Sequence, residues 1–396
     1  MVNSKILYDL LMLVNVTSII FPQRKISDPI NKQIRRTGYP GEVHTIYTDD
    51  GYRLRLHRIP YGYKKSQRNV TSREPLLLVH GALCSGSMWV HHPRKSRQAL
   101  AFMLADAGYD VWLFSARGTS PSLGHKTLTI HDEKYWKFSW HEIGFYDIPK
   151  TIDYILMKTG KKTLYYAGHS QGCSVFAVAM SQKPEYNQKI KAAYLMSPGI
   201  YIDSVQGFIK MLIENRVGKF LEDFFKVTHI YWWPLRNPII NDVIFSFCNT
   251  NSATFICTLY LVEIIGPLSD NLEKGEFVKF FFEYIVDNIA VRQLVHLQTL
   301  VQKKSFVMYD YGNDNNEVYG SENPPEYDLS KISVPIAIMG AEDDALVTLK
   351  DVKKLANSLK PVKDLIILPG NHLEIFYIKK TANELKRTMI KSFTQV

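Results

Sequence analysis

One pentapeptide has the residue types and spacing of a nucleophile for acyl transfer. Gly168 to Gly172 reads Gly-His-Ser-Gln-Gly and is the one G-x-S-x-G match in the chain. An apolar run, Thr163 to Ala167, leads into it, and the small and apolar residues Cys173 to Met180 predict a helix behind it. A strand, a sharp turn and a helix in this order expose a serine hydroxyl at the top of a sheet. We therefore predict that Ser170 is a nucleophile; the alternative is an ordinary tight turn with a capping serine.

Two loops late in the chain carry the acid and the base that such a serine requires. In folds of this kind the acid and then the histidine follow the serine, in loops at the carboxyl ends of later strands. Apolar runs end at Met339 and Leu368, and Asp343, Asp344 and His372 follow them. His372 is the one histidine C-terminal to the acidic pair, so we predict that it is the base. The residues alone do not separate Asp343 from Asp344 as its partner.

Backbone N–H groups are needed as well, because the tetrahedral intermediate of acyl transfer carries a negatively charged oxygen. Gln171 directly follows the predicted nucleophile and would supply one N–H group. The early strand Leu76 to Val79 leads into His80-Gly81-Ala82, and we predict that the Ala82 N–H is the second donor. The plainer interpretation of His80-Gly81 is a turn that ends the strand.

The other histidines, acids and cysteines give no sign of a second site. His91, His92 and His125 are interpreted as surface or loop residues, and His141, beside a polar turn, as a structural hydrogen-bonding residue. No H-E-x-x-H motif occurs, and no carboxylates have metal-ligand spacing. The four cysteines form no C-x-x-C pair, which argues against structural zinc. We predict neither a metal nor an organic cofactor.

Short apolar runs without alternation predict buried parallel strands, because a strand covered on both faces needs apolar side chains throughout. These runs are Leu76–Val79, Asp110–Phe114, Thr163–Ala167, Ala192–Met196, Ile336–Met339 and Leu365–Leu368. Helical patterns such as Asp147–Leu156 separate most of them, so we predict an α/β fold with a mostly parallel sheet. The alternation fails within residues 201–327, which are aromatic and helix-like. We therefore predict a core of residues 26–200 and 328–396 that carries an insertion at 201–327.

Composition and charge exclude several classes of protein. The chain has 396 residues, of which 46% are hydrophobic and 22% charged, and this rules out a disordered or low-complexity chain. The net charge of +10 raises the question of nucleic-acid binding, but the basic residues are scattered and no nucleic-acid-binding motif is present. A cationic surface that tolerates anionic lipid or polysaccharide is the better interpretation.

The amino-terminal part of the chain carries signals for export. Residues 1–25 contain an apolar run after Lys5 and are interpreted as a signal peptide, the alternative being a plain N-terminal helix. This run is too short to span a bilayer, as is the later stretch Thr254 to Leu268. Asn69 begins an Asn-Val-Thr glycosylation sequon. Together these features predict a secreted protein without a transmembrane segment.

Segments along nearly the whole chain, from about Gly38 onward, are similar to those of one enzyme family. Phe138 to Glu142, which reads Phe-Ser-Trp-His-Glu, is the most specific of them. The other similar segments are Thr48–Tyr52, Leu78–Gly81, Gly108–Trp112, Gly168–Gly172, Arg292–Leu294 and Asn371–Leu373. With them the chain resembles the acid lipases of the gastric and lysosomal type and their insect relatives.

This resemblance implies an α/β-hydrolase fold in which residues 201–327 form a helical cap, with a mobile lid, over an acyl pocket. It assigns the role of catalytic acid to Asp344 rather than Asp343, and it pairs Cys248 with Cys257 in a cap disulfide. The substrates that it implies are long-chain acyl esters, either triacylglycerols or sterol esters, met at a lipid–water interface or a lipid droplet. A secreted or lysosomal location follows from the same resemblance.

Three positions depart from the family pattern: Ala345, where relatives usually carry Trp, Glu374, where they carry Asp, and the stretch Phe114 to Ala116. None removes a catalytic group, so we predict hydrolysis of long-chain carboxylic esters through a Ser-His-Asp acyl-enzyme mechanism. A short-chain carboxylesterase or an acyltransferase on the same scaffold is one alternative, and a non-catalytic lipid-binding relative is another. Cys84 and Cys173 are then expected to be free thiols.

Overall fold

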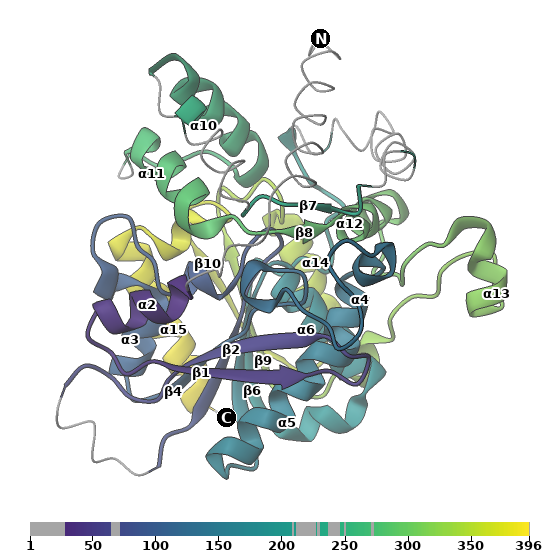
Figure 1. Ribbon diagram of the computed structural model, residues 1–396, viewed down its shortest axis with the longest axis horizontal. Helices are drawn as coiled ribbons and strands as arrows, with labels where there is room; N and C mark the ends of the chain where they lie inside the picture. The colour runs from purple at the N-terminus through teal and green to yellow at the C-terminus, as the bar shows by residue number, and fades with distance from the viewer. Residues whose placement is uncertain are drawn as a thin grey trace.

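The computed structural model describes a central sheet with helices on both faces and further helices beyond one end of the strands (Figure 1). The described residues are 28–64, 72–207, 210, 227, 230–236, 246–248, 251–270 and 273–395. The expected signal peptide, residues 1–25, and the sequon at Asn69 lie outside these ranges. The predicted α/β architecture is confirmed.

Eight strands form the main sheet, in the order β1-β2-β4-β3-β5-β6-β9-β10. The pairs β1–β2 and β2–β4 are antiparallel, and all the others are parallel. The strands are β1 (Glu42–Tyr47), β2 (Arg53–Ile59), β3 (Pro75–Val79), β4 (Asp110–Leu113), β5 (Leu164–His169), β6 (Ile190–Met196), β9 (Ile336–Ala341) and β10 (Val362–Leu368). The six predicted strands are all present. β1 and β2 were missed because polar, partly exposed side chains interrupt both strands, so neither offers a continuous apolar run.

Alternate side chains of the central strands enter two separate cores. In β3, Leu76 and Leu78 pack in one hydrophobic cluster, whereas Leu77 and Val79 pack in another. Burial on both faces explains why this strand is apolar throughout. The first core is closed by α2 (Pro29–Arg36), α3 (Leu100–Asp106) and α15 (Lys379–Thr394), and the second by α5 (Ile148–Thr159), α6 (Gln171–Gln182) and α14 (Leu349–Ser358).

The described part of residues 201–327 adds no strand to the main sheet. Figure 1 places α10, α11 and a small two-stranded ribbon beyond the end of the sheet at which β5 leads into α6. The elements are β7 (Trp232–Trp233), α10 (Asn251–Ile265), α11 (Lys274–Phe280), β8 (Ile289–Ala290), α12 (Val291–Lys303) and α13 (Asn315–Tyr319). Across the described ranges, no helix has both the length and the apolar character that crossing a membrane requires.

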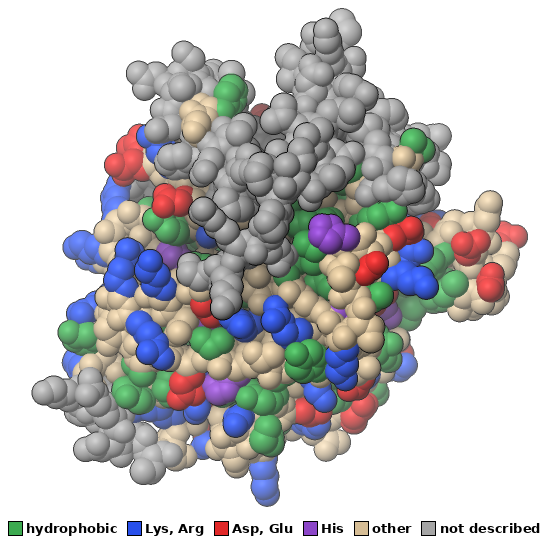
Figure 2. All heavy atoms as spheres, viewed as in Figure 1, with side chains coloured by type: hydrophobic (Ala, Val, Ile, Leu, Met, Phe, Trp, Pro, Cys, Tyr) green, Lys and Arg blue, Asp and Glu red, His purple; other side chains and the backbone are tan. Residues whose placement is uncertain are grey.

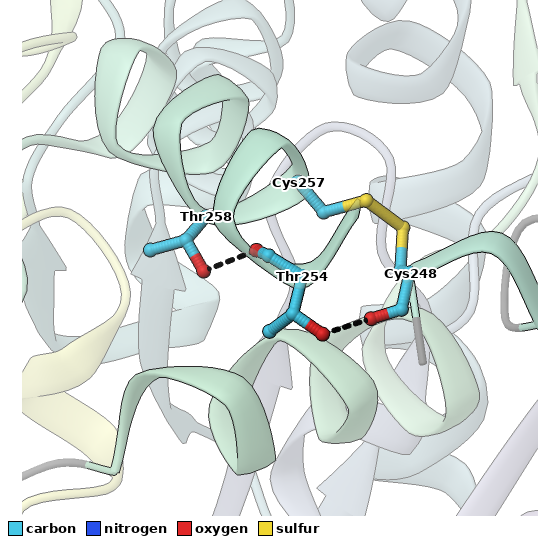
Figure 3. Close-up of a disulfide and its surroundings, with 4 residues drawn as sticks. All are labelled: Cys248, Thr254, Cys257 and Thr258. Atoms are coloured by element: carbon cyan, nitrogen blue, oxygen red, sulfur yellow. Dashed lines mark hydrogen bonds between the residues drawn. A yellow bond between two sulfur atoms is a disulfide. The ribbon is translucent and has the colours of Figure 1, made fainter. Parts of the chain in front are cut away.

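A disulfide ties the short helical segment before α10 to that helix (Figure 3). It joins Cys248 to Cys257, the pair that the family resemblance implies. Thr254 Oγ1 donates to the Cys248 carbonyl at 2.6 Å, and Thr258 Oγ1 donates to the Thr254 carbonyl at 2.7 Å. The other two cysteines of the chain are free and buried, as expected.

Candidate active site

Ser170 occupies the sharp turn between β5 and α6. Its φ of 52° and ψ of −117° are strained for a residue with a side chain, and its N–H donates to the Met196 carbonyl at 2.9 Å. Two glycines make the turn possible by close packing. A Cβ on Gly172 would lie 2.4 Å from the Val79 carbonyl oxygen, and one on Gly168 would lie 2.8 Å from the Gly172 carbonyl. The turn therefore needs glycine on both sides of the serine.

His372 and Asp344 form a buried hydrogen-bonded pair. His372 Nδ1 lies 2.7 Å from Asp344 Oδ2. Since a carboxylate only accepts, the imidazole proton lies on Nδ1, and Nε2 keeps a lone pair that can accept a proton. The second carboxylate oxygen accepts from the N–H groups of Leu346 and Val347, at 3.0 and 2.8 Å. Asp343 is exposed, and no hydrogen bond is described between its side chain and the imidazole. The geometry therefore separates the two aspartates and favours Asp344.

His169, the residue before the serine, links the elbow to the histidine loop. Its Nε2–H donates to the His372 carbonyl at 2.9 Å, and the centroids of the two rings are 4.7 Å apart. Burial, together with the neighbouring His372, holds the pKa of His169 well below its usual range, so its ring is neutral. The variable second position of G-x-S-x-G gave no signal for this role. His169 thus attaches the His372 loop to the strand end that carries Ser170, and no hydrogen bond between the Ser170 and His372 side chains is described.

The end of α10 supports the same loop from the other side. The His372 N–H donates to the Ile265 carbonyl at 3.1 Å, and Asn371 Nδ2 donates to the Pro267 carbonyl at 2.8 Å. Glu374, one of the departures from the family pattern, is buried and accepts from the Ser269 N–H at 3.0 Å. Its carboxylate thus fixes the loop and does not join the acid–base pair.

The loop after β3 packs directly against the nucleophile. A Cβ on Gly81 would lie 3.1 Å from the Ser170 Cβ, which shows how closely the loop approaches. His80 controls the direction of the next peptide group. The Ala116 N–H donates to His80 Nε2 at 3.0 Å, and His80 Nδ1–H donates to the Gly81 carbonyl at 2.8 Å. Because the Gly81 carbonyl and the Ala82 N–H belong to one trans peptide group, they point in opposite directions.

His80 performs this task as a neutral ring. Burial lowers its pKa to about 4, against a smaller opposing effect of Asp287. A neutral imidazole with Nδ1–H and an unprotonated Nε2 is the tautomer that both hydrogen bonds require. Sequence reasoning gave His80 no role beyond a strand-ending turn.

Of the other histidines that the sequence singled out, His91 and His92 lie in a loop, as expected. Both are buried, at 6% and 8% exposure: the His91 ring stacks on Tyr284, and the His92 ring packs edge-on against Tyr377. His141 Nδ1 shares a hydrogen bond of 2.6 Å with the Tyr327 hydroxyl, which is a structural role. Among the described residues, no three His, Cys, Asp or Glu side chains gather as metal ligands do.

Comparison with known proteins gives one consistent answer. A model described as a partial α/β-hydrolase lipase region matches residues 30–93, and a model of the α/β-hydrolase fold matches residues 74–236. Lipase member N of Homo sapiens is 33% identical over 86% of this chain and 84% of its own length. Lipase 3 of Drosophila melanogaster is 34% identical over 88% of this chain and 87% of its own. Gastric triacylglycerol lipase of Rattus norvegicus is 30% identical over 92% and 91%.

Solved structures agree on the fold. A thermophilic esterase from Thermogutta terrifontis superposes with a TM-score of 0.51, at 12% identity, and covers 89% of this chain and 99% of its own. At that identity the likeness concerns the fold alone. The relatives at 30% identity or more, which span most of both chains, decide the family. The chain belongs to the gastric and lysosomal acid lipase family of the α/β-hydrolases.

Proposed function

We propose that this protein is a lipase that hydrolyses carboxylic esters of long-chain fatty acids through an acyl-enzyme. The observation that carries the proposal is the 2.7 Å contact between His372 and Asp344, in a loop that His169 attaches to the elbow of Ser170. A serine on a strained turn, an oriented imidazole and a buried carboxylate are the groups that acyl transfer from an ester requires.

In the first half of the reaction, Ser170 Oγ attacks the ester carbonyl carbon while its proton moves to His372 Nε2. The N–H groups of Gln171 and Ala82 donate to the oxyanion that forms. The bond to the alcohol oxygen then breaks, and this oxygen leaves with the proton from His372. Asp344 holds the ring in place and stabilises the imidazolium cation between these two steps.

In the second half, water repeats the attack on the acyl-enzyme. His372 removes a proton from the water, and the hydroxyl oxygen bonds to the acyl carbon. The new tetrahedral intermediate uses the same two N–H donors. Its collapse returns the proton to Ser170 Oγ and releases a fatty acid, so that the enzyme regains its starting state.

Apolar surroundings support long-chain acyl substrates. In our proposal residues 26–200 and 328–396 form the catalytic core and residues 201–327 the cap. α11 in the cap packs Phe277 and Phe280 against Tyr377, which follows the histidine loop. Triacylglycerols and sterol esters both suit such a site, and one relative is by name a triacylglycerol lipase.

The disulfide and the basic surface indicate where the enzyme works. A disulfide suits an oxidising compartment, which supports a secreted or lysosomal location. Lys and Arg side chains are spread over the face shown in Figure 2, and the net charge of the chain is +10. A cationic surface of this kind favours contact with anionic lipid, so we place the substrate at a lipid–water interface or a lipid droplet.

Labelling with a fluorophosphonate probe tests the nucleophile. The wild-type protein should label to one equivalent, and Ser170→Ala should neither label nor hydrolyse a p-nitrophenyl ester. Ser174→Ala is the matched control, because Ser174 lies one turn further along α6 and donates to the Gly199 carbonyl. It should label fully. Label that persists in Ser170→Ala would refute the assignment.

A series of esters with increasing acyl length tests the substrate class. The kcat/KM should rise from butyrate toward the long-chain esters, because each buried methylene contributes about 0.8 kcal/mol. A preference for short chains would favour a carboxylesterase instead. Measurement of released fatty acid against transfer to an added alcohol separates hydrolysis from acyl transfer.

A further inference from the structure

A buried carboxylate in the inserted segment binds two core loops beside the nucleophile. Asp287 is 2% exposed. Its carboxylate accepts from the N–H and the Oγ–H of Ser120 and from the N–H of Asn288, each at 2.8 Å. The main-chain N–H of Asp287 donates to the Leu83 carbonyl, also at 2.8 Å. One residue of the insertion therefore joins the loop after β3 to the loop after β4.

The contact with Leu83 restrains the loop that carries the proposed donor Ala82. This loop has no regular secondary structure between β3 and Gly86, and Leu83 adopts a φ of 59°, a left-handed conformation that is unfavourable for a side-chain residue. His80 holds the Gly81 carbonyl on one side of Ala82, and Asp287 holds the Leu83 carbonyl on the other. The segment Gly81–Leu83, which carries the donor, is thus held at both ends, by His80 and by Asp287.

A second residue of the same segment reaches the other donor. Gln293, in the first turn of α12, is 5% exposed, and its Oε1 accepts from Gln171 Nε2 at 2.8 Å. Gln171 is the first residue of α6, so the helix itself fixes the direction of the Gln171 main-chain N–H. The side-chain hydrogen bond between Gln171 and Gln293 therefore attaches α12 to the turn that carries Ser170. Its effect on the alignment of the Gln171 N–H is smaller than the effect of Asp287 on Ala82.

We propose that Asp287 and Gln293 form a clamp that positions the oxyanion hole, with Asp287 acting on the Ala82 loop and Gln293 on Gln171. This clamp rests on the proposed function, because it presupposes that the two N–H groups stabilise an oxyanion. Asp287 and Gln293 are positioning residues that act through their neighbours. It follows that any movement that lifts this segment from the core also misaligns a donor.

The expected signature is a loss in kcat with little change in KM. Oxyanion donors act on charge that exists only in the transition state, so their misalignment does not weaken binding of the ground state. Complete loss of one donor costs about 10²- to 10³-fold in kcat. Asp287→Ala keeps the main-chain N–H that bonds the Leu83 carbonyl but removes the carboxylate that anchors this residue to Ser120. The donor is then displaced and not lost, so we expect about a 30-fold loss in kcat.

The test compares variants on a dissolved p-nitrophenyl butyrate, which avoids effects of interface binding. Each preparation is normalised by fluorophosphonate titration to completion, which counts folded sites even where labelling is slow. Asp287→Asn keeps the side-chain volume and one acceptor oxygen, so it should lose less than Asp287→Ala. Gln293→Leu should lose about fivefold in kcat, and Gln293→Glu, which retains an acceptor for Gln171, should stay near the wild type.

The matched control is Arg292→Ala. Arg292 Nη1 also connects this segment to the core, through the Lys137 carbonyl at 3.1 Å, and its described side-chain contacts are with Lys137, Tyr309 and Tyr311, outside both donor loops. Its normalised kcat should match that of the wild type. Should this control lose as much kcat as Asp287→Ala, general loosening of the insertion would explain the data and the clamp would be wrong.

Other outcomes separate the clamp from the proposed function. A wild-type kcat in both Asp287 variants, or a raised KM at unchanged kcat, would overturn the clamp. If Asp287→Ala does not fold, Asp287→Asn and the two Gln293 variants carry the test. Ester hydrolysis that survives in Ser170→Ala would refute the proposed function itself. An inactive Ser170→Ala beside a fully active Asp287→Ala would refute only the clamp.

Discussion

The substitution Gly172→Ala tests the packing of the nucleophile elbow with a single added carbon atom. A Cβ at this position would lie 2.4 Å from the Val79 carbonyl oxygen and 3.0 Å from the His80 carbonyl oxygen. Val79 belongs to β3, which is paired on both sides, with β4 and β5, and has little freedom to move. The start of α6 must therefore retreat by about 0.6 Å or more to reach even the shortest tolerated contact.

Two effects of opposite sign set the stability of this variant. Alanine has a higher helix propensity than glycine by about 1 kcal/mol. Overpacking against a backbone costs typically 1–3 kcal/mol, and a contact this short belongs at about the upper end. The overpacking strain exceeds the gain in helix propensity, so Gly172→Ala should lower the free energy of unfolding by about 2 kcal/mol. The same retreat displaces Ser170 and the Gln171 N–H, and a displacement of about 1 Å costs about 10²-fold in rate. We expect kcat to fall between about 10- and 100-fold.

Urea unfolding and kcat on p-nitrophenyl butyrate measure the two effects separately, after active-site titration. Gly160→Ala is the control, because Gly160 ends α5 with a φ of 67° and has no atom within 4 Å of the new Cβ. It should cost about 1 kcal/mol in stability through backbone strain and leave kcat unchanged. A folded Gly172→Ala with kcat within threefold of the wild type would refute the packing argument.

Three further predictions concern the acid, the pH dependence and the disulfide. Asp344→Asn should lower kcat by about 10⁴-fold, because an amide group opposite the catalytic histidine favours the wrong tautomer; Asp343→Asn, at an exposed position, should stay within twofold. The free energy of unfolding should have its full value above about pH 6.5 and fall progressively toward pH 4. In this range histidines are protonated in the unfolded chain, whereas the buried histidines of the folded protein stay neutral. Burial lowers the pKa values of these histidines to about 4 for His80 and His91 and about 3 for His296. His91→Phe should remove about 1.4 kcal/mol per pH unit from that slope in urea unfolding. Cys257→Ser should destabilise α10 by roughly 2.5 kcal/mol, by the loop-entropy estimate for a 9-residue separation, and limited proteolysis should then cut the cap before the core.

Equal losses in Asp343→Asn and Asp344→Asn would mean that the hydrogen-bond geometry misidentifies the acid. A stability that stays flat from pH 6.5 to pH 4.5 would show that the buried histidines are protonated in the folded protein. Unchanged proteolysis of Cys257→Ser would show that α10 is held by packing alone, without help from the cross-link.

Local sequence was enough to predict the nucleophile and to find the central strands. The elbow around Ser170 is contiguous, and its glycines, strand and helix all appear in one short stretch. Burial on both faces makes a strand such as β3 apolar throughout, and that signal can be read without a fold. β1 carried no such signal, because half-exposed edge strands mix polar and apolar residues.

Tertiary structure decided every question that depended on the surroundings of a side chain. Asp343 and Asp344 are adjacent and chemically identical, and only the fold exposes one and buries the other against His372. His91 and His92 were expected in a loop or on the surface, and only the fold buries them, against Tyr284 and Tyr377 respectively.

The residues that hold the site in place could not be recognised from the sequence, for the same reason. His80 and His169 stand beside the predicted donor and nucleophile, but their hydrogen bonds run to partners far away in the chain, at Ala116 and His372. The sequence by itself determined the family and the fold class and predicted the order of the reacting groups, because these follow from local patterns. Which atoms hold those groups in position was decided only by tertiary structure, because hydrogen bonds between distant segments exist only once the chain has folded.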